Sequence, residues 1–445
     1  MNRDLLLGAV ADDYTGGSDL ASMLRERGVR TVQVLGLQSD DFAETLRDYQ
    51  AVVISLKSRS LPAPEACALS LRAVDQLTRL RARQVQFKYC STFDSTRQGN
   101  IGPVIDTLMD RLASHFTLAV PALPVNGRTQ YLGHLFVGNE LLSESPLRHH
   151  PLTPMTDSNL VRHLQSQTRR KVGLIAFPTV QSGAEKILQE CCRLEAEGIE
   201  VALVDALTED NLDKIAEAAV DFPLITGGSG LGMALPCAWA RRGWLKSSAV
   251  HQRSRCSEQT GSVLILSGSC STMTLQQIQS FRESGGTLVA LNVPRLLSHG
   301  PTEEAAHLLS AVEPALQHGK PVLVFSSAGP ADRAQVLLEA GRDVDEVHQW
   351  IEKSLAAVAA EVVQRGLSQR LIVAGGETSG AVVDALKIQA VEVLAAIDPG
   401  VPCLKSVGSQ PLALALKSGN FGSLDFFNKA VTALRGISLS KEGGL

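Results

Sequence analysis

Apolar, strand-like runs alternate with amphipathic helical windows along nearly the whole chain, and this rhythm constrains the fold more than any other feature. Between the runs, windows such as Leu20–Glu26 and Pro64–Leu80 repeat Leu, Ala and Val at helical spacing. The runs show little polar alternation, which is typical of strands buried on both faces of a parallel sheet covered by helices. In the first half they are Leu5–Ala11, Thr31–Leu35, Ala51–Ser55, Val85–Lys88, Thr117–Val120, Lys171–Phe177, Glu200–Val204 and Pro223–Thr226.

The second half repeats the rhythm independently. Its strand-like runs are Val263–Leu266, Thr287–Val293, Pro321–Phe325, Leu371–Ala374 and Leu412–Lys417, and its clearest helical windows are Thr274–Ser284 and Asp343–Arg365. Between the halves, residues 241–261 lose the periodicity and become basic and rich in Ser. A chain of 445 residues also exceeds what one hydrophobic core usually serves. The sequence therefore predicts an α/β protein of two domains, 1–240 and 262–445, joined by a linker at 241–261, each a mainly parallel sheet flanked by helices.

Composition narrows the class of protein. Hydrophobic residues make up 44% and charged residues 20%, which is typical of a globular protein. A net charge of −4 without a basic block argues against a nucleic-acid partner. No apolar run is long enough to span a bilayer, and two aspartates follow the first apolar stretch where a signal peptide would place small residues. The eight cysteines form no C-x-x-C pair, so we expect reduced thiols and no structural zinc. We expect a cytoplasmic chain without a membrane partner.

Two adjacent carboxylates, Asp12 and Asp13, end the first predicted strand before a Thr-Gly-Gly-Ser turn. In parallel α/β sheets, ligands bind beyond the carboxyl ends of the strands. Either carboxylate could accept a proton from a substrate hydroxyl while the other orients it or binds a metal. The alternative is structural, with Asp13 capping a turn and Ser18 capping the helix that follows.

A second polar segment, KYCSTFDST, follows the strand that ends at Lys88, and the basic segment SLKSRS follows the third strand. Lysine supplies charge, hydroxyls supply adaptable hydrogen bonds, and arginine grips carboxylates in a bidentate manner, which suits a polyol carboxylate. The alternative is an ordinary Ser/Thr-rich loop beside solvated basic residues. The candidate substrate ligands are Lys57, Arg59, Lys88, Ser91, Thr92 and Asp94.

A third region runs from Pro124 to Thr129, with Arg128 as a further candidate, and continues into a long loop-like stretch at Leu142–Asp157. Loops of this length are usually functional. The adjacent His149 and His150 could bind a metal or shuttle protons, but adjacent histidines in loops are more often surface residues or caps. The sequence therefore predicts no definite set of metal ligands.

Glycine-rich turns dominate the second half and follow three of its strands. They are Ser267–Ser271, Gly375–Gly380 and Lys417–Gly422, and Gly227–Gly232 in the first half is a fourth. Glycine lets backbone N–H groups approach phosphates, and a helix N-terminus adds unpaired donors, so the three turns together predict a phosphate or nucleotide site. The chain has no G-x-x-x-x-G-K-[ST] loop, no G-x-G-x-x-G after the first strand and no protein-kinase signature set.

Taken in order, these segments resemble the four-carbon acid sugar kinase family over nearly the whole chain. The matching segments are ADDYTGGSDLA (11–21), KYCSTFDST (88–96), NGRTQYLGHLFVG (126–138), ITGGSGLG (225–232), LSGSCSTMT (266–274), AGGETSG (374–380) and LKSGNFG (416–422). Many members carry Lys-x-x-Ser-Thr-Leu-Arg-Gly where this chain places Asp94 at the arginine position. The STFDST form looks like the branch that phosphorylates 3-oxo-tetronate, and replacing an arginine by Asp94 should change which acid fits.

The resemblance implies that the N-terminal domain binds the acid sugar, that the C-terminal domain binds ATP, and that the reaction takes place in the cleft between them. It assigns substrate contacts to Asp12, Arg59 and residues 88–94. The expected nucleotide ligands are Ser267, Ser269, Gly375, Gly376, Glu377, Thr378, Gly408, Lys417 and Gly419.

The expected reaction transfers the γ-phosphoryl group of ATP, with Mg²⁺, to the C4 hydroxyl of the acid, most simply 3-oxo-tetronate. Asp12 or Asp13 would orient or deprotonate that hydroxyl, and basic residues among Lys57, Arg59, Lys88 and Arg128 would hold the carboxylate. One alternative is a threonate or erythronate kinase, and another is a non-catalytic two-domain metabolite-binding protein. The expected partners are the sugar acid and ATP, and a homodimer is the assembly to test.

Overall fold

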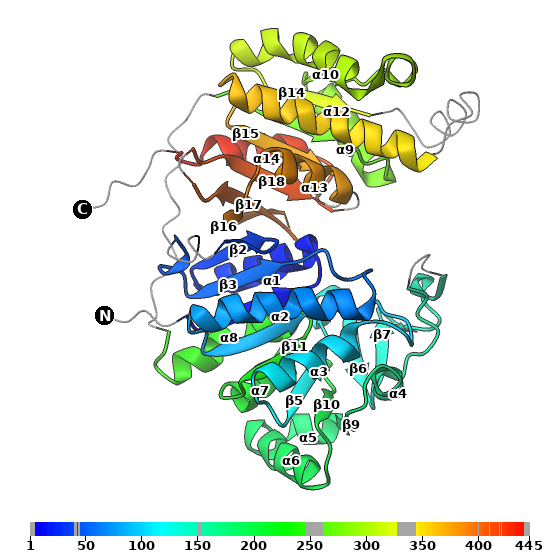
Figure 1. Cartoon of the computed structure of the whole chain (residues 1–445), viewed down its shortest axis with the longest axis vertical. Coiled ribbons are helices and arrows are strands. Elements are labelled where there is room, and N and C mark those ends of the chain that lie inside the picture. Colours follow the sequence, from blue (N-terminus) through cyan, green and yellow to red (C-terminus); the bar gives the residue numbers. More distant parts are fainter. Residues whose placement is uncertain are drawn as a thin grey trace. The chain divides into compact units, whose positions relative to one another are not determined.

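The computed structural model describes residues 5–39, 42, 45–149, 153–245, 261–326, 344–398, 400–408, 410–417, 419 and 421–439 (Figure 1). The chain divides into two compact units, Met1–Val250 and His251–Leu445. Most of the predicted linker, residues 246–260, lies outside the described residues. Each unit carries a sheet with helices packed on it, which confirms the predicted α/β class.

The first unit has a parallel sheet in the strand order β2-β3-β1-β4-β11-β5-β10-β9. β1, β2 and β3 are buried at every position, so their apolar runs are covered on both faces. The strands are β1 (Leu7–Ala11), β2 (Thr31–Leu35), β3 (Ala51–Ser55), β4 (Gln84–Lys88), β5 (Thr117–Val120), β9 (Val172–Ile175), β10 (Val201–Val204) and β11 (Leu224–Gly227).

The helices of this unit flank the sheet, with α1, α8 and α7 side by side and α2 against α3 (Figure 1). They are α1 (Tyr14–Glu26), α2 (Ala63–Arg79), α3 (Ile101–Arg111), α4 (Leu160–Gln165), α5 (Phe177–Gln181), α6 (Ala184–Ala196), α7 (Glu209–Ala219) and α8 (Ser229–Arg241). The prediction that Ser18 caps the first helix was wrong. Asp13 caps it, because its Oδ1 accepts a hydrogen bond from Gly16 N at 3.0 Å, and Ser18 lies inside the helix.

A small antiparallel sheet, which the sequence did not predict, lies in the same unit. It consists of β6 (Arg128–Tyr131), β7 (His134–Val137) and β8 (Glu140–Leu141). The buried Asp205 anchors it by accepting hydrogen bonds from Leu132 N (2.7 Å) and Gly133 N (2.9 Å). Within the predicted loop at Leu142–Asp157, the 3-10 turn η3 spans Pro146–His149, and His150 lies outside the described residues.

The second unit has the strand order β13-β14-β12-β15-β18-β17-β16, parallel from β13 to β18 and antiparallel for β17 and β16. α9 packs beside α14, and α12 packs beside α10 and α13 (Figure 1). The strands are β12 (Leu264–Ser267), β13 (Thr287–Ala290), β14 (Val322–Phe325), β15 (Arg370–Ala374), β16 (Ala390–Asp398), β17 (Val401–Ser406) and β18 (Ala413–Lys417). The helices are α9 (Thr272–Glu283), α10 (Val293–Gln317), α12 (Val344–Gln364), α13 (Gly376–Ala385) and α14 (Phe426–Arg435).

Two predicted strands were too long at their carboxyl ends. The strand predicted to reach Val293 ends at Ala290, because Asn292 caps α10 through a hydrogen bond from Arg295 N at 2.9 Å. The strand predicted to reach Phe177 ends at Ile175, and α5 begins at Phe177. In the described residues, no helix combines the length and apolarity that crossing a membrane requires, and no disulfide joins the cysteines.

Candidate active site

The order of the central strands brings the first two polar segments to one edge of the sheet. β1 lies between β3 and β4, and Ala11 at its end is in register with Ser55 and Lys88. Directly beyond it, Asp12 N donates to Lys88 O at 3.0 Å, and Ser58 N donates to Asp12 O at 2.9 Å. The backbone thus places the Asp12 carboxylate among the residues that follow β3 and β4.

Arg59 joins the two adjacent carboxylates. Its Nε and Nη2 donate to the two oxygens of Asp12 at 2.9 and 2.8 Å, and Nη2 also donates to Asp13 Oδ1 at 2.6 Å. The Asp12 side chain is 4% exposed, whereas those of Asp13 and Arg59 are 23% and 27% exposed. Among the described residues, Nη1 of Arg59 has no hydrogen-bond partner. Asp13 is therefore the more accessible carboxylate of the pair, and Arg59 keeps donors that no described residue uses.

The two carboxylates have pKa values shifted in opposite directions. Burial raises the pKa of Asp12 above its usual value, although Arg59 opposes the shift. Burial acts in the same way on Asp13, but the charges of Arg59 and Lys88 and a hydrogen bond from Thr15 outweigh it, so the pKa of Asp13 is lowered. Asp13 therefore remains a carboxylate at neutral pH.

Lys88 adds a buried cation to this cluster. Its Nζ donates to Tyr89 O at 3.0 Å, and the structure gives the ammonium group no other hydrogen-bond partner in the described ranges. A Cβ atom added to Gly16 would lie 2.9 Å from Nζ and 2.3 Å from Asp13 Oδ1, so a glycine is needed where the helix begins. Lys88 thus retains donors for an anionic ligand.

The loop at residues 90–96, which we call the substrate loop, lies beside the cluster. Phe93 N donates to Cys90 O at 2.9 Å, and Thr92 Oγ1 donates to Asp94 Oδ1 at 2.5 Å. Burial, followed by the charge of Asp94, raises the pKa of Cys90 to about 11, while the charge of Arg59 opposes the increase. The thiol at the start of the loop is therefore close to both Asp94 and Arg59.

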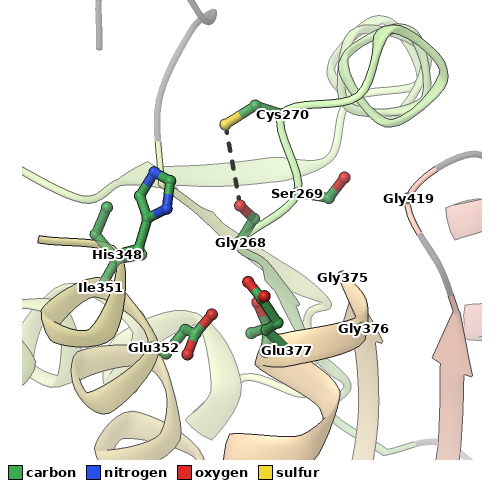
Figure 2. A pocket seen from close by; sticks show the side chains of 11 residues that line it. Gly268, Ser269, Cys270, His348, Ile351, Glu352, Gly375, Gly376, Glu377 and Gly419 are labelled. Carbon is green, nitrogen blue, oxygen red and sulfur yellow. Dashed lines mark hydrogen bonds between the residues drawn. The ribbon is translucent and has the colours of Figure 1, made fainter. Parts of the chain in front are cut away.

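In the second unit, the predicted glycine turns converge on a cavity of about 310 Å³. A Cβ atom on Gly268 would lie 2.1 Å from Thr378 Oγ1, and one on Gly419 would lie 2.4 Å from Ser269 Oγ, so only glycines permit this approach. Figure 2 shows the residues that line the cavity, and Glu352 and Glu377 are among them. The full lining is Gly268, Ser269, Cys270, His348, Ile351, Glu352, Gly375, Gly376, Glu377, Thr378 and Gly419.

Comparison with known proteins agrees with this division of sites. Residues 7–235 match the family model described as a sugar-binding N-terminal domain, and residues 264–427 match the nucleotide-binding C-terminal domain. A curated 3-oxo-tetronate kinase of Pseudomonas savastanoi is 45% identical over 437 residues, covering 98% of this chain and 99% of that protein. The chain belongs to the four-carbon acid sugar kinase family.

Other relatives cover equally long stretches. A 3-oxo-tetronate kinase of Cupriavidus necator is 44% identical, covering 97% of this chain and 98% of its own length. The crystal structure of a Haemophilus influenzae protein has a TM-score of 0.82 and 41% identity, covering 96% of this chain and all (100%) of that one. A Salmonella typhimurium LT2 structure, provisionally described as a tRNA synthase, has a TM-score of 0.84 and 41% identity, covering 95% and 98%.

Not every predicted ligand of the acid sugar kinase site joins these clusters. Lys57 is exposed, with Nζ 5.0 Å from the centre of the Tyr14 ring. Arg128 lies on β6 and donates to Asn126 O, and in the described part of the chain no hydrogen bond or ion pair links it to Asp13 or Arg59. Their contact with the acid stays a prediction.

Three of the predicted nucleotide ligands do not line the cavity. Ser267 is fully buried, and Gly408 follows β17. Lys417 is also buried, and its Nζ donates to Gly419 O at 2.9 Å and to Thr274 Oγ1 at 3.2 Å. Burial lowers the pKa of Lys417 to about 8. Lys417 therefore supports the turn that carries Gly419.

The fourth glycine turn has a packing role in the structure. Cβ atoms added to Gly228 and Gly230 would lie 2.6 Å from Pro121 O and 2.5 Å from Ala122 O. These glycines let the start of α8 pack directly against the backbone that follows β5. These contacts explain why glycines occupy both positions, and the explanation needs no phosphate ligand.

Sequence reasoning missed two contributions to the sites of this kinase family member. Asn100 Nδ2 donates to Ser58 O (2.9 Å), Arg59 O (3.2 Å) and Leu61 O (2.9 Å), which holds the segment that carries Arg59. His348 and Glu352 of α12 line the cavity of the second unit. Their spacing of four residues places them on one face of a helix, which was the only available signal.

Proposed function

We propose that this chain transfers the γ-phosphoryl group of ATP to the C4 hydroxyl of a four-carbon sugar acid, and that the acid is 3-oxo-tetronate. The observation that carries the proposal is the end-to-end identity with curated 3-oxo-tetronate kinases, 45% over 437 residues. Two sites of different chemistry support it. The first unit carries a cationic and carboxylate cluster suited to a hydroxy acid, and the second carries glycine turns suited to phosphates.

The acid carboxylate would bind to the unused donors of Arg59 and Lys88. Nη1 of Arg59 and two N–H groups of Lys88 have no hydrogen-bond partner in the described residues, and both cations lie beside Asp13. Charge-assisted hydrogen bonds from buried cations are stronger than neutral ones. Thr92 and Asp94 of the substrate loop would form hydrogen bonds with the hydroxyl groups of the acid.

Asp13 would orient the attacking hydroxyl and accept its proton, whereas Asp12 would hold Arg59 in place. Both oxygens of Asp12 accept hydrogen bonds from Arg59, and Asp13 is the more exposed carboxylate. A lowered pKa suits this role, because phosphoryl transfer passes through a loose transition state that needs orientation of the nucleophile more than a strong base.

Mg²⁺ would bind with the nucleotide in the second unit. The cavity offers the carboxylates of Glu352 and Glu377, and a nucleotide-bound Mg²⁺ usually takes one or two protein carboxylates in addition to phosphate oxygens and water. Bound there, the ion would neutralise charge on the phosphates. Transfer requires the acid and the γ-phosphoryl group to meet, and the cleft expected between the domains stays a prediction.

The test is an ADP-release assay with 3-oxo-tetronate, threonate and erythronate as separate acceptors, with Mg²⁺ or with EDTA. We expect the highest kcat/KM for 3-oxo-tetronate and no turnover in EDTA. Faster turnover of threonate or erythronate would select the alternative kinase. Binding of an acid without any acid-dependent ADP release would indicate a metabolite-binding protein.

A further inference from the structure

Phe93, in the middle of the substrate loop, has an unusual backbone conformation. Its φ is +56°, a region that bulky residues rarely adopt and that persists only where the surroundings enforce it. Its ring is fully buried and makes edge-to-face contacts with Tyr89 (5.2 Å between ring centroids) and His163 (5.8 Å). The loop is therefore held in shape by contacts outside itself.

Further contacts come from His163 of α4 and from Gln167, two residues beyond the end of that helix. His163 Nε2 donates to Ser95 O at 2.9 Å, and the ring is buried. Gln167 Nε2 donates to Ser95 Oγ at 2.9 Å and to Thr96 O at 2.5 Å, while Gln167 Oε1 accepts from Gly102 N at 3.0 Å. Both side chains thus bind the same end of the loop, and His163 also packs on the Phe93 ring.

We propose that His163 and Gln167 are positioning residues for the sugar acid, because they fix the substrate loop in the shape that presents Thr92 and Asp94. Thr92 and Asp94 are the two neighbours of Phe93. Since the Phe93 ring is fixed in the core and the Ser95–Thr96 backbone is bound by His163 and Gln167, the peptide groups on both sides of Phe93 are constrained. The inference rests on the proposed function for the identity of the ligand.

The deciding variant is Gln167→Glu, which keeps the size of the side chain and the acceptor for Gly102 N but removes the two donors to the loop. Gln165→Glu is the matched control. Gln165 lies two residues away, donates to Arg170 O (2.9 Å) and Thr168 O (3.4 Å) and accepts from Val172 N (3.0 Å), and within the described ranges it forms no hydrogen bond with the loop.

We expect Gln167→Glu to raise KM for the sugar acid roughly tenfold and to leave KM for ATP unchanged. Gln165→Glu should change neither constant. His163→Phe, which keeps a ring against Phe93 but loses the donor to Ser95 O, should shift KM for the acid in the same direction. An unchanged KM for the acid in Gln167→Glu and His163→Phe, or an equal rise in Gln165→Glu, would overturn the proposal.

Hydrogen exchange separates this inference from the proposed function. In the ligand-free chain, amides of residues 90–96 should exchange faster in Gln167→Glu than in the wild type and in Gln165→Glu. Equal exchange in all three proteins would reject the proposal that Gln167 holds the substrate loop. If the wild type released no ADP with any of the acids, the proposed function would fail, and the exchange result would still decide whether Gln167 holds the loop.

Discussion

At the scale of single residues, Asp12 and Asp13 share one arginine but differ in what else they contact. Both carboxylate oxygens of Asp12 accept hydrogen bonds from Arg59, and the residue is almost without solvent contact. Asp13 also caps α1 and keeps an exposed side. The sequence predicted a functional pair and could not divide the roles, because both residues follow the same strand and only the folded chain shows that Asp12 is buried and that Asp13 caps α1.

This difference predicts unlike defects for two isosteric changes. Asp13→Asn should lower kcat at least about 100-fold while the melting temperature stays near that of the wild type, because asparagine is an equally good helix cap. Asp12→Asn should lower kcat and also destabilise the chain by about 3 kcal/mol, because Arg59 loses the buried carboxylate that accepts two of its hydrogen bonds and keeps only its contact with Asp13. Steady-state kinetics and denaturant unfolding measure both. Equal stability losses in the two variants would contradict the assignment.

Lys417 predicts a pH dependence of nucleotide affinity. Burial lowers its pKa to about 8, so the ammonium charge is present below that pH and is lost as the pH rises through it. If this charge attracts nucleotide phosphates, Kd for ATP should rise about tenfold between pH 7.5 and roughly pH 9.5. Calorimetric titration would measure Kd. In Lys417→Met, ATP should bind weakly and Kd should not change over the same pH range. A flat wild-type profile would exclude an electrostatic role for Lys417.

Several of the residues that the sequence predicted lie at the carboxyl ends of strands. Asp12, Lys88 and Gly375 lie at strand ends, where parallel sheets place their ligands. Asn100, His163 and Gln167 act through backbone carbonyls of other segments, and nothing in their local sequence names those carbonyls. Their contribution could be seen only once the chain was folded.

At the scale of elements, β2, β3 and β5 have the bounds that the sequence predicted. They are short apolar runs buried at every position, for which the pattern is unambiguous. Two of the antiparallel strands that were missed, β6 (RTQY) and β16, are partly exposed. A search for continuous apolar runs detects strands covered on both faces and overlooks those that face water.

Glycine turns that look alike in sequence should respond differently to an added methyl group. Gly230→Ala would place Cβ 2.5 Å from Ala122 O, so we expect a destabilisation of about 1–3 kcal/mol and unchanged nucleotide affinity. Gly376→Ala meets no atom within 4 Å, so stability should hold while nucleotide affinity falls, because the methyl group enters the cavity wall. Unfolding and nucleotide titration of both variants would test this. Lower nucleotide affinity in Gly230→Ala and lower stability in Gly376→Ala would show that the phosphate site had been assigned to the wrong turn.

At the scale of the whole molecule, the two sites belong to different units, each with its own sheet and core. A ligand that binds only the native form of a unit stabilises that unit, by about 2.7 kcal/mol at a hundredfold excess over Kd. The acid and the nucleotide should therefore leave separate signatures on the same chain. The separate stabilisation of the two units by the two ligands could be measured even without turnover.

Hydrogen exchange of the full chain with one ligand at a time would measure these signatures. ADP with Mg²⁺ alone should slow exchange at Gly268–Cys270 and Gly375–Thr378, and 3-oxo-tetronate alone should slow it at residues 57–59 and 90–96. Gly376→Ala should weaken the first effect and leave the second, because its methyl group lies only in the nucleotide cavity wall. Protection of residues 90–96 by ADP, with none at Gly375–Thr378, would contradict the division of ligands between the units.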